Sequence, residues 1–319
     1  MKALVTGASG FVGKYLLEHL LENELHIVAT KLKENSVVLK DPNITWIDLN
    51  ILDEIDVMQK IRLHKPDYIF HLAGQSSVKL SWDNIGNTLN TNIIGSLNIL
   101  ESVRVTGLQC RVILIGSSEE YGIYPVNRMP LKEDYNTNPR SPYAISKMTQ
   151  ELLGKLYFNS FNINNVMVRA FNHIGPGQDT RFVVADFSKQ IIEIEKGLKA
   201  PTITVGNIDV ERDFTDVRDV VRAYYSLSKC GKGGEIYNVC SGIPIKISEI
   251  LKQLISLSTY KGIIEISIDS NKYRKNDMMK LYGSNEKLNK ATGWERKYSN
   301  IKESLNDILN YWRKEHGIL

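Results

Sequence analysis

Glycines at positions 7, 10 and 13 stand between a short apolar run and an amphipathic stretch near the start of the chain. The run at residues 3–6 is typical of a buried strand, and the leucines within residues 13–21 share one face of a helix. Glycines let the backbone turn tightly between the two elements and approach a pyrophosphate, which the free N–H groups and the dipole of the helix stabilise. The segment therefore predicts a strand–turn–helix unit that binds a dinucleotide.

Short β-branched runs alternate with amphipathic stretches through the first half of the chain. Because parallel strands need crossover connections, which helices supply, this alternation predicts a doubly wound parallel sheet of the α/β Rossmann type. Leu89, Ile93, Leu97 and Leu100 share a helical face and predict one of the covering helices. The predicted strands are residues 3–6, 27–30, 45–47, 68–72, 111–115 and 166–169.

The chain of 319 residues is longer than one compact core usually supports, so we expect a second, smaller α/β domain. The alternation stops at the loop of residues 175–178, and the helix that follows has an apolar stripe that includes Val184 and Phe187. The run 236–239 is again typical of a strand and is expected to rejoin the first domain. The predicted division is 1–172 with 213–240 for the Rossmann domain, and 173–212 with 241–319 for the second domain.

Charge and cysteine content argue against several classes of protein. The 40 basic and 36 acidic residues give a net charge of +4 without a long single-sign run, which disfavours nucleic-acid or membrane-surface binding. No apolar stretch has membrane-spanning length, and the first apolar run is too short for a signal peptide. Cys110, Cys230 and Cys240 lie far apart and suggest buried thiols of a reducing cytosol, and the histidines form no cluster, so we predict a cytoplasmic protein without a metal site.

The end of the second predicted strand bears on the choice of cofactor. Folds that prefer NAD carry an acidic residue there, whereas this chain has Thr30, Lys31 and then Lys33. No carboxylate is predicted to repel a 2′-phosphate, and the lysines can pair with one, so NADPH is favoured and NADH remains an alternative. Asp48, after the third predicted strand, is a candidate contact for the adenine edge.

A tyrosine and a lysine four residues apart point the same way from a helix, and the ammonium lowers the tyrosine pKa from about 10. Spacing alone is weak evidence, because the chain holds three such pairs. Only the pair Tyr143 and Lys147 accompanies a serine, Ser117, just past the carboxyl end of a predicted strand, where ligands bind in open α/β sheets. The three pairs are Tyr143/Lys147, Tyr225/Lys229 and Tyr298/Lys302.

Ser117, Tyr143 and Lys147 together resemble the catalytic triad of the short-chain dehydrogenase/reductase family, in its extended form with a separate sugar-nucleotide domain. The resemblance implies that the second domain binds a nucleotide sugar. Arg212 and Arg274 match arginines that grip the nucleotide diphosphate in this family, for which a guanidinium group is well suited.

Two further segments are similar to the same family. Residues 71–77 resemble its histidine–alanine segment beside the cofactor, although Gly74 stands where a second alanine is usual, and Asn92 matches an asparagine that supports the active-site helix. Residues 169–178 resemble the signature of the GDP-6-deoxy-D-mannose reductases, and stretches 182–187 and 205–219 are similar to the same enzymes. This implies reduction of the C4 ketone of GDP-4-keto-6-deoxy-D-mannose to GDP-6-deoxy-D-mannose, also called GDP-D-rhamnose.

The resemblance assigns a role to individual residues. The catalytic set is Ser117 for the oxyanion, Tyr143 for the proton, Lys147 for the ribose and the tyrosine, and Glu119 as a candidate base. The cofactor-binding set is Gly7, Ser9, Gly10, Phe11, Val12, Gly13, Thr30, Lys31, Asp48, Leu49, Leu72, Ala73, Tyr143, Lys147 and Phe171. The substrate-binding set is Ser76, Ser117, Ser118, Asn172, Arg181, Asn207, Arg212, Arg274 and Asp277.

Alternatives remain open at this point. Ser117, Ser118 and Glu119 also resemble the threonine–serine–glutamate of GDP-mannose 4,6-dehydratases, whose glutamate removes the C5 proton, but residues 174–178 differ from the dehydratase segment. A nucleotide-sugar 4-epimerase, another 4-reductase and a dinucleotide sensor without catalysis are further hypotheses. The resemblance also implies a homodimer built from helices near residues 88–105 and 143–158.

Overall fold

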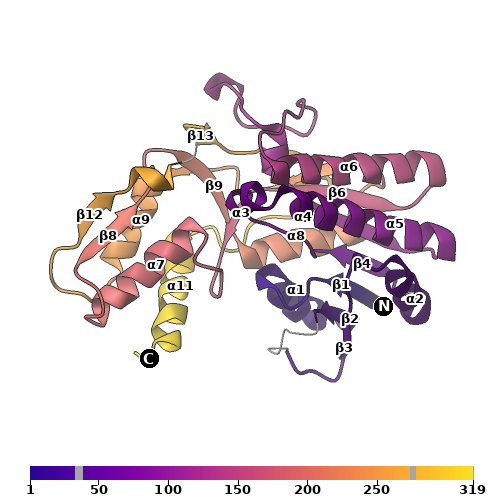
Figure 1. Cartoon of the computed structure of the whole chain (residues 1–319), viewed down its shortest axis with the longest axis horizontal. Helices are drawn as coiled ribbons and strands as arrows, with labels where there is room; N and C mark the ends of the chain where they lie inside the picture. The colour runs from indigo at the N-terminus through magenta and orange to yellow at the C-terminus, as the bar shows by residue number, and fades with distance from the viewer. Residues whose placement is uncertain (33–38, 274–277, 319) are drawn as a thin grey trace.

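The computed structural model describes residues 1–32, 39–273 and 278–318. Its larger part is one parallel sheet of seven strands in the order β10-β6-β5-β4-β1-β2-β3 (Figure 1). This order, with helices on both faces, confirms the predicted doubly wound Rossmann-type fold. The strands are β1 (Lys2–Thr6), β2 (His26–Lys31), β3 (Ile44–Asp48), β4 (Tyr68–His71), β5 (Arg111–Ser117), β6 (Asn165–Ala170) and β10 (Ile236–Val239).

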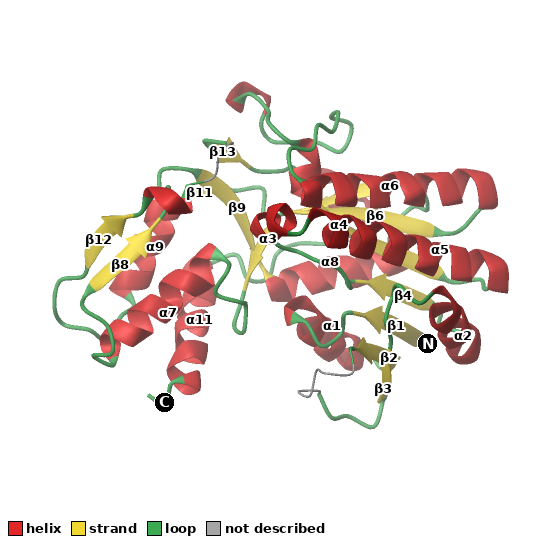
Figure 2. Cartoon of the chain, viewed as in Figure 1, coloured by secondary structure: helices red, strands yellow, loops and turns green. Residues whose placement is uncertain are grey.

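Each face of this sheet has its own helices and its own core (Figure 2). On one face α1 (Phe11–Glu22) packs against α8 (Val217–Cys230), and the leucines of α1 that the sequence placed on one helical face are almost all fully buried there. On the other face α5 (Gly95–Thr106) packs between α2 (Glu54–His64) and α6 (Pro142–Phe161). The two cores hold the strand ends in fixed positions, which is what a site at those ends requires.

The helix predicted around residues 89–100 is interrupted. The chain forms α3 (Val78–Asp83), α4 (Ile85–Leu89) and a π-helical turn (Asn90–Ile94) before α5 begins. The extra residue of the π turn changes the face that later side chains present, so of the four predicted apolar positions only Leu100 is fully buried. The prediction of a single stripe was therefore wrong.

The rest of the chain forms smaller sheets and three helices with a separate core. The helices α7 (Val183–Glu195), α9 (Ile247–Ser256) and α11 (Ile301–Glu315) pack on one another, at the left in Figure 2. The strands β7 (Asn172–Ile174), β9 (Glu211–Asp216), β11 (Pro244–Lys246) and β13 (Lys280–Leu281) form one sheet, and β8 (Thr202–Val205) pairs with β12 (Glu265–Ile268).

Two segments lie elsewhere than the predicted domain boundaries would place them. All of β9, including residues 213–216, pairs within the smaller sheet, although 213–240 was predicted to lie in the Rossmann domain. Conversely α10 (Glu286–Thr292) packs on α8 and β10, and Trp294 joins the core of the large sheet. The helix α10 is too short for its hydrophobic periodicity to show which sheet it packs on. The division into domains stays a proposal.

The cysteines are free thiols. Cys110 and Cys240 are buried as expected, but Cys230 is exposed at the end of α8, which corrects the prediction of three buried thiols. Among the residues that the structure describes, no helix is both long enough and apolar enough to cross a membrane.

Candidate active site

The glycine turn after β1 has the shape that a pyrophosphate site needs. Gly7 has a φ of +67°, and a Cβ there would lie 2.8 Å from the backbone nitrogen of Ala73, so only glycine fits. Gly10 begins α1, and within the described chain no side chain caps its first N–H groups. The Thr30 hydroxyl accepts a hydrogen bond from the Gly7 nitrogen at 3.3 Å and braces the turn against β2. The turn thus leaves helical N–H groups for an anion and fits a dinucleotide.

Lys31 and Asp48 end neighbouring strands, and their side chains form an ion pair. The two residues are in register, and Lys31 Nζ lies 3.3 Å from Asp48 Oδ1. As the sequence predicted, β2 itself ends without a carboxylate, but its pairing with β3 brings that of Asp48 to the same end. The strand that carries Asp48 is separate in sequence from β2, so only the pairing of the strands reveals the contact. Lys33 lies outside the described residues.

Ser117 is the last residue of β5 rather than a residue beyond it, which corrects the predicted strand end. It begins the short 3₁₀ helix η2 (Ser118–Tyr121) with a capping box, in which Glu119 donates its backbone N–H to the Ser117 hydroxyl at 3.2 Å. The side chain of Tyr143 lies beside that of Ser117, close enough for the serine to lower the pKa of the tyrosine. Serine and tyrosine, 26 positions apart in sequence, are therefore neighbours at the carboxyl end of the sheet.

Tyr143 and Lys147 lie on the first turns of α6, where Ser141 caps the helix by accepting a hydrogen bond from Ala144 at 3.1 Å. Burial raises the pKa of Tyr143 above its usual value, and the side chain of Ser117 opposes that shift. Burial also lowers the pKa of Lys147 to about 8. The prediction that Lys147 lowers the tyrosine pKa therefore does not describe this structure.

The ammonium group of Lys147 has partners other than the tyrosine. It donates to the carbonyl of Ile115 at 2.8 Å and to Oε1 of Gln150 at 3.0 Å. These bonds hold the lysine between β5 and its own helix, directly behind the strand end. The lysine is therefore placed beside the site, with its charge directed at the sheet.

Asn92, in the π turn, connects two parts of the site as the sequence led us to expect. Its side chain accepts from the Gln75 nitrogen at 2.8 Å and donates to Ser146 of α6 at 2.9 Å. A Cβ at Gly74 would lie 2.7 Å from Asn92 Oδ1, so an alanine there would displace the asparagine side chain. The asparagine thus links the segment after β4 to the helix that carries Tyr143.

The predicted substrate residues come from several separate segments of the chain. Arg212 on β9 donates from Nη1 to the carbonyls of Glu211 at 2.8 Å and Met278 at 2.7 Å, which ties it to the segment that follows Arg274 and Asp277. Arg274 and Asp277 themselves lie outside the described residues. Among the remaining members, Ser76 and Asn172 are exposed and Ser118 is buried. The side chain of Asn207 accepts a hydrogen bond from the Asp209 nitrogen, and Arg181 forms an ion pair with Asp179 at 2.8 Å.

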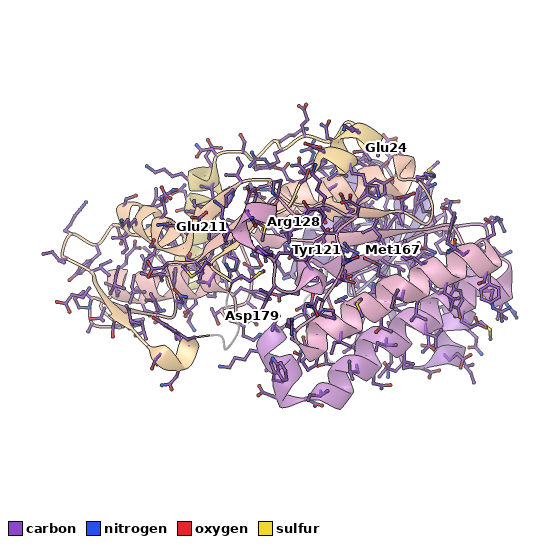
Figure 3. The ribbon with its side chains drawn as sticks, turned by 90° about the horizontal axis from the view of Figure 1, so that it is seen from above. Glu24, Tyr121, Arg128, Met167, Asp179 and Glu211 are labelled. Carbon is purple, nitrogen blue, oxygen red and sulfur yellow. The ribbon has the colours of Figure 1, made fainter. Side chains whose placement is uncertain are left out.

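Phe171 was predicted to lie near the nicotinamide. Its ring is buried in a cluster with Tyr121, Leu131 and Cys240, and its position beside a bound cofactor stays a prediction. Figure 3 labels Tyr121 near the middle of the molecule, between the larger part and the smaller one. The cluster therefore lies at the junction between the two parts of the chain.

Two groups at the site were not identified from the sequence. The Thr6 hydroxyl, at the end of β1, accepts from the Ala73 nitrogen at 3.2 Å and so joins the glycine turn to the strand beside it. Glu120 is fully buried and accepts from the Ser117 nitrogen at 2.6 Å. Its only sequence signal is that it follows Glu119 as a second acidic residue directly after the predicted site.

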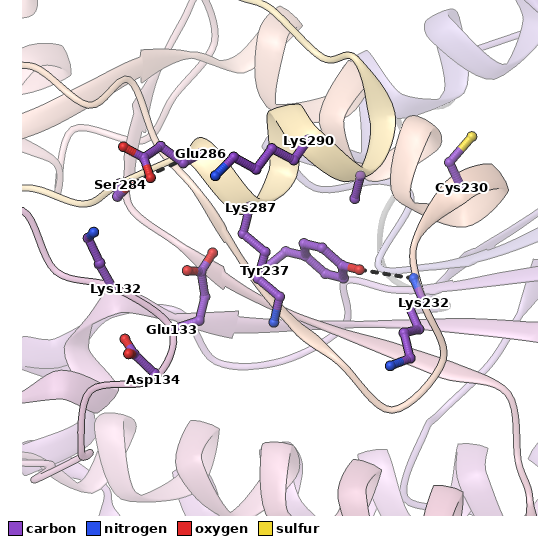
Figure 4. A pocket seen from close by; sticks show the side chains of 11 residues that line it. Lys132, Glu133, Asp134, Cys230, Lys232, Tyr237, Ser284, Glu286, Lys287 and Lys290 are labelled. Atoms are coloured by element: carbon purple, nitrogen blue, oxygen red, sulfur yellow. Dashed lines mark hydrogen bonds between the residues drawn. The ribbon is translucent and has the colours of Figure 1, made fainter.

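A separate groove of about 660 Å³ lies at the outer edge of β10 (Figure 4). It contains none of the predicted site residues, and its lysines are balanced by carboxylates, as where Lys287 pairs with Glu235 at 2.8 Å. Within the described ranges, no group of three or more histidine, cysteine, aspartate or glutamate side chains could hold a metal ion. The groove is lined by Lys132, Glu133, Asp134, Cys230, Lys232, Tyr237, Ser284, Glu286, Lys287, Lys290 and Ala291.

The parallel sheet, the glycine turn after β1 and the Ser117–Tyr143–Lys147 group after β5 define an enzyme of the NAD(P)-dependent short-chain dehydrogenase/reductase type. The family model described as GDP-mannose 4,6 dehydratase matches residues 4–307. The chain belongs to this family of extended short-chain dehydrogenases/reductases, as the sequence predicted.

Individual relatives are similar to the chain over nearly its whole length. The chain is 34% identical over 316 residues to GDP-6-deoxy-D-mannose reductase of Pseudomonas aeruginosa, covering 98% of this chain and 97% of the relative. It is 28% identical to GDP-mannose 4,6-dehydratase of Yersinia enterocolitica, covering 92% and 89%. Among solved structures, RMD from Pseudomonas aeruginosa complexed with NADPH is similar with a TM-score of 0.84 at 34% identity, covering 98% of this chain and 99% of the other.

Proposed function

We propose that the protein reduces the C4 ketone of GDP-4-keto-6-deoxy-D-mannose to GDP-6-deoxy-D-mannose (GDP-D-rhamnose). The observation that carries the proposal is the juxtaposition of Ser117 and Tyr143 at the carboxyl end of β5, with Lys147 one helical turn after the tyrosine. The choice of substrate is supported by the 34% identity to a reductase of that name over nearly the whole of both chains.

The reduction needs a proton donor and a group that stabilises the oxygen as it becomes negatively charged. Tyr143 is suited to donate the proton, because burial raises its pKa and keeps the phenol protonated until an alkoxide forms beside it. The Ser117 hydroxyl donates a hydrogen bond to the same oxygen. Lys147 adds a positive charge behind both groups and would bind the nicotinamide ribose.

The cofactor proposed for this site is NADPH, which supplies the hydride when bound. Gly7, Ser9 and the first turn of α1 would hold its pyrophosphate, and Lys31 would meet the 2′-phosphate. The similar structure from Pseudomonas aeruginosa is complexed with NADPH, which supports this choice. The ion pair of Lys31 with Asp48 opposes it, because the carboxylate occupies the lysine and repels a phosphate, so NADH remains the alternative cofactor.

The sugar nucleotide would lie across the junction between the two parts of the chain. Asn172 on β7, Arg181 before α7 and Arg212 on β9 all follow β6 in the chain. Ser76 and Ser118 follow β4 and β5. We propose that the guanidinium and amide groups bind the diphosphate and that the serines contact the sugar.

One observation favours a second function. Glu119 follows the Ser117–Ser118 pair and donates its backbone N–H to the Ser117 hydroxyl at 3.2 Å, so it lies beside a group of the proposed catalytic set. A carboxylate in that place can remove the C5 proton of a 4-keto sugar, which is the base that a GDP-mannose 4,6-dehydratase requires. The dehydratase is therefore the alternative function.

A comparison of two substrates separates these functions. Purified protein is incubated with NADPH and either the 4-keto-6-deoxy sugar nucleotide or GDP-mannose. The reductase consumes NADPH with the keto sugar and does not change GDP-mannose. Formation of the keto sugar from GDP-mannose without added reductant would instead establish the dehydratase.

We further propose a homodimer and a cytoplasmic location. The outer faces of α5 and α6 carry exposed apolar side chains, including Val105, Leu152, Leu156 and Phe161, which a second copy could cover. Analytical ultracentrifugation of the wild-type protein and of a Leu152→Glu, Leu156→Glu double variant tests the dimer. A wild-type monomer would contradict it.

A further inference from the structure

A carboxyl group is buried directly behind the candidate catalytic serine. Glu120 of η2, Glu151 of α6 and Arg169 of β6 have side chains that are 0%, 5% and 3% exposed. Arg169 donates two hydrogen bonds to Glu151, from Nε at 2.8 Å and from Nη2 at 3.0 Å. Its Nε lies 3.8 Å from Glu120 Oε2. One guanidinium group thus faces two carboxyl groups in an interior closed to solvent.

Glu120 makes one direct contact with the site. Its Oε1 accepts the backbone N–H of Ser117 at 2.6 Å, as the second half of the capping box. The backbone of β5 is shaped to admit this carboxyl group, because a Cβ at Gly116 would collide with Glu120 Oε1. The position of Ser117 is therefore set on one side by Tyr143, through its hydroxyl, and on the other by Glu120, through its amide.

The second oxygen of Glu120 indicates that the group is neutral. Among the described residues, Oε2 has no hydrogen-bond partner although it is buried. Arg169 donates two hydrogen bonds to Glu151 and none to Glu120, so an ionised Glu120 would leave a buried carboxylate oxygen without a donor. A proton on Oε2 removes that charge and supplies a donor for Glu151, whose side chain lies within hydrogen-bond reach.

The charges that face Glu120 shift its pKa in opposite directions, and burial decides the outcome. Burial raises its pKa most, and the charge of Glu151 raises it further, whereas the amide of Ser117 and the charge of Arg169 lower it. On α6, Tyr143 and Lys147 also sense its charge. The pKa of Glu120 is therefore well above the usual value for a glutamate, consistent with the unpartnered oxygen.

We propose that Glu120 is a positioning residue: as a neutral carboxylic acid bound to the Ser117 amide, it holds the Ser117 hydroxyl against Tyr143. The inference rests on the proposed function, in which Ser117 and Tyr143 act on the C4 ketone. Glu120 does not touch the substrate and acts only through the serine. A neutral acid is suited to this place, because an ionised one would add negative charge behind the oxygen that becomes an alkoxide.

Two variants of similar volume separate the hydrogen bond from the packing. Glu120→Gln keeps a neutral acceptor for Ser117 and a donor for Glu151, and is expected to keep kcat within about twofold of the wild type. Glu120→Leu fills the same space without an acceptor, and is expected to lower kcat by about tenfold or more, because the serine is no longer held in line. KM and the Kd for NADPH are expected to stay unchanged in both.

A matched control removes a buried charge elsewhere. Glu195, which is 2% exposed on its side chain, binds Arg313 in the core of the smaller part at 2.8 Å. Glu195→Gln is expected to lower Tm without changing kcat. A Glu120→Leu variant with wild-type kcat would overturn the inference, as would a Glu120→Gln variant as impaired as Glu120→Leu, since charge rather than the hydrogen bond would then be required.

A measurement without turnover distinguishes this inference from the proposed function. Infrared difference spectra between the wild type and Glu120→Gln, at neutral pH, are expected to show the carbonyl band of one protonated buried carboxyl group that shifts in D₂O. If the wild type fails to reduce the keto sugar but shows this band, the proposed function is wrong and the neutral state of Glu120 holds. Absence of the band overturns the inference even if the enzyme is active.

Discussion

The ion pair between Lys31 and Asp48 gives the most quantitative prediction on the cofactor. The two side chains meet at 3.3 Å where β2 and β3 end, and they are 24% and 46% exposed. In the proposed site the same lysine binds the 2′-phosphate that distinguishes NADPH from NADH. Lys31→Ala should therefore weaken NADPH binding selectively, and Asp48→Asn should release the lysine for the phosphate.

The magnitudes follow from the two interactions. A hydrogen bond between charged groups contributes about 1.5 to 3 kcal/mol, which corresponds to about a 10- to 150-fold increase in the Kd for NADPH in Lys31→Ala. A half-exposed ion pair is worth about 0.2 to 1 kcal/mol, so Asp48→Asn should tighten NADPH by no more than about fivefold. NADH lacks the phosphate, and its Kd should not respond to Lys31→Ala.

Fluorescence titrations with both cofactors measure these changes. Lys60→Ala serves as the control, because Lys60 forms a comparable surface ion pair with Asp56 at 3.7 Å on α2. An unchanged NADPH Kd in Lys31→Ala, or an equal loss for NADPH and NADH, would refute the role given to the lysine. Weaker binding of both cofactors in Asp48→Asn would show that the carboxylate contacts the adenine edge, as the sequence suggested.

Three further predictions concern catalysis, the glycine turn and pH. Tyr143→Phe should lower kcat by about 10²- to 10⁴-fold with an unchanged Kd for NADPH, measured by steady-state kinetics and titration; full activity would exclude Tyr143 as the proton donor. Gly7→Ala should reduce cofactor binding and cost about 1 to 2 kcal/mol in urea unfolding, because φ is +67° and the Cβ would press on Ala73; wild-type binding would refute the close approach. Burial lowers the pKa of His71 to about 3, so the ring is neutral in the folded protein and takes up a proton near pH 6.5 when the chain unfolds. Its stability contribution is complete above pH 6.5 and is lost as pH falls toward 3, by up to about 1.4 kcal/mol per pH unit, and His71→Gln should flatten that slope between pH 7 and 5.

Periodicity and glycine spacing predicted the large sheet well, because each strand and helix there buries one continuous face. The strand at 236–239 has the predicted bounds, and α1 carries its leucines on the buried face as expected. The stripe at residues 89–100 failed for a local reason: Asn92 uses its side chain to join Gln75 to Ser146, and the helix accommodates it with a π turn. Hydrophobic spacing contains no information on such a polar constraint.

The candidate site was predictable as a set of residues, less so as a set of contacts. Ser117 and Tyr143 do lie together at the carboxyl end of β5, as the order of strands and helices along the sequence led us to expect. The ion pair of Lys31 with Asp48 depends on the pairing of β2 with β3, and the partners of Lys147 depend on the depth to which α6 packs. The partners of Lys31 and Lys147 are thus set by tertiary packing, which the residues around each lysine in the sequence do not reveal.

Transfer of deuterium tests the central claim most directly. The enzyme is supplied with NADPH that carries deuterium at the reactive position of the nicotinamide, together with the 4-keto-6-deoxy GDP sugar, and the product is examined by NMR and mass spectrometry. The proposed function predicts one deuterium atom at C4 of the sugar for each NADPH oxidised. A product without deuterium at C4, or deuterium at C6, would contradict it.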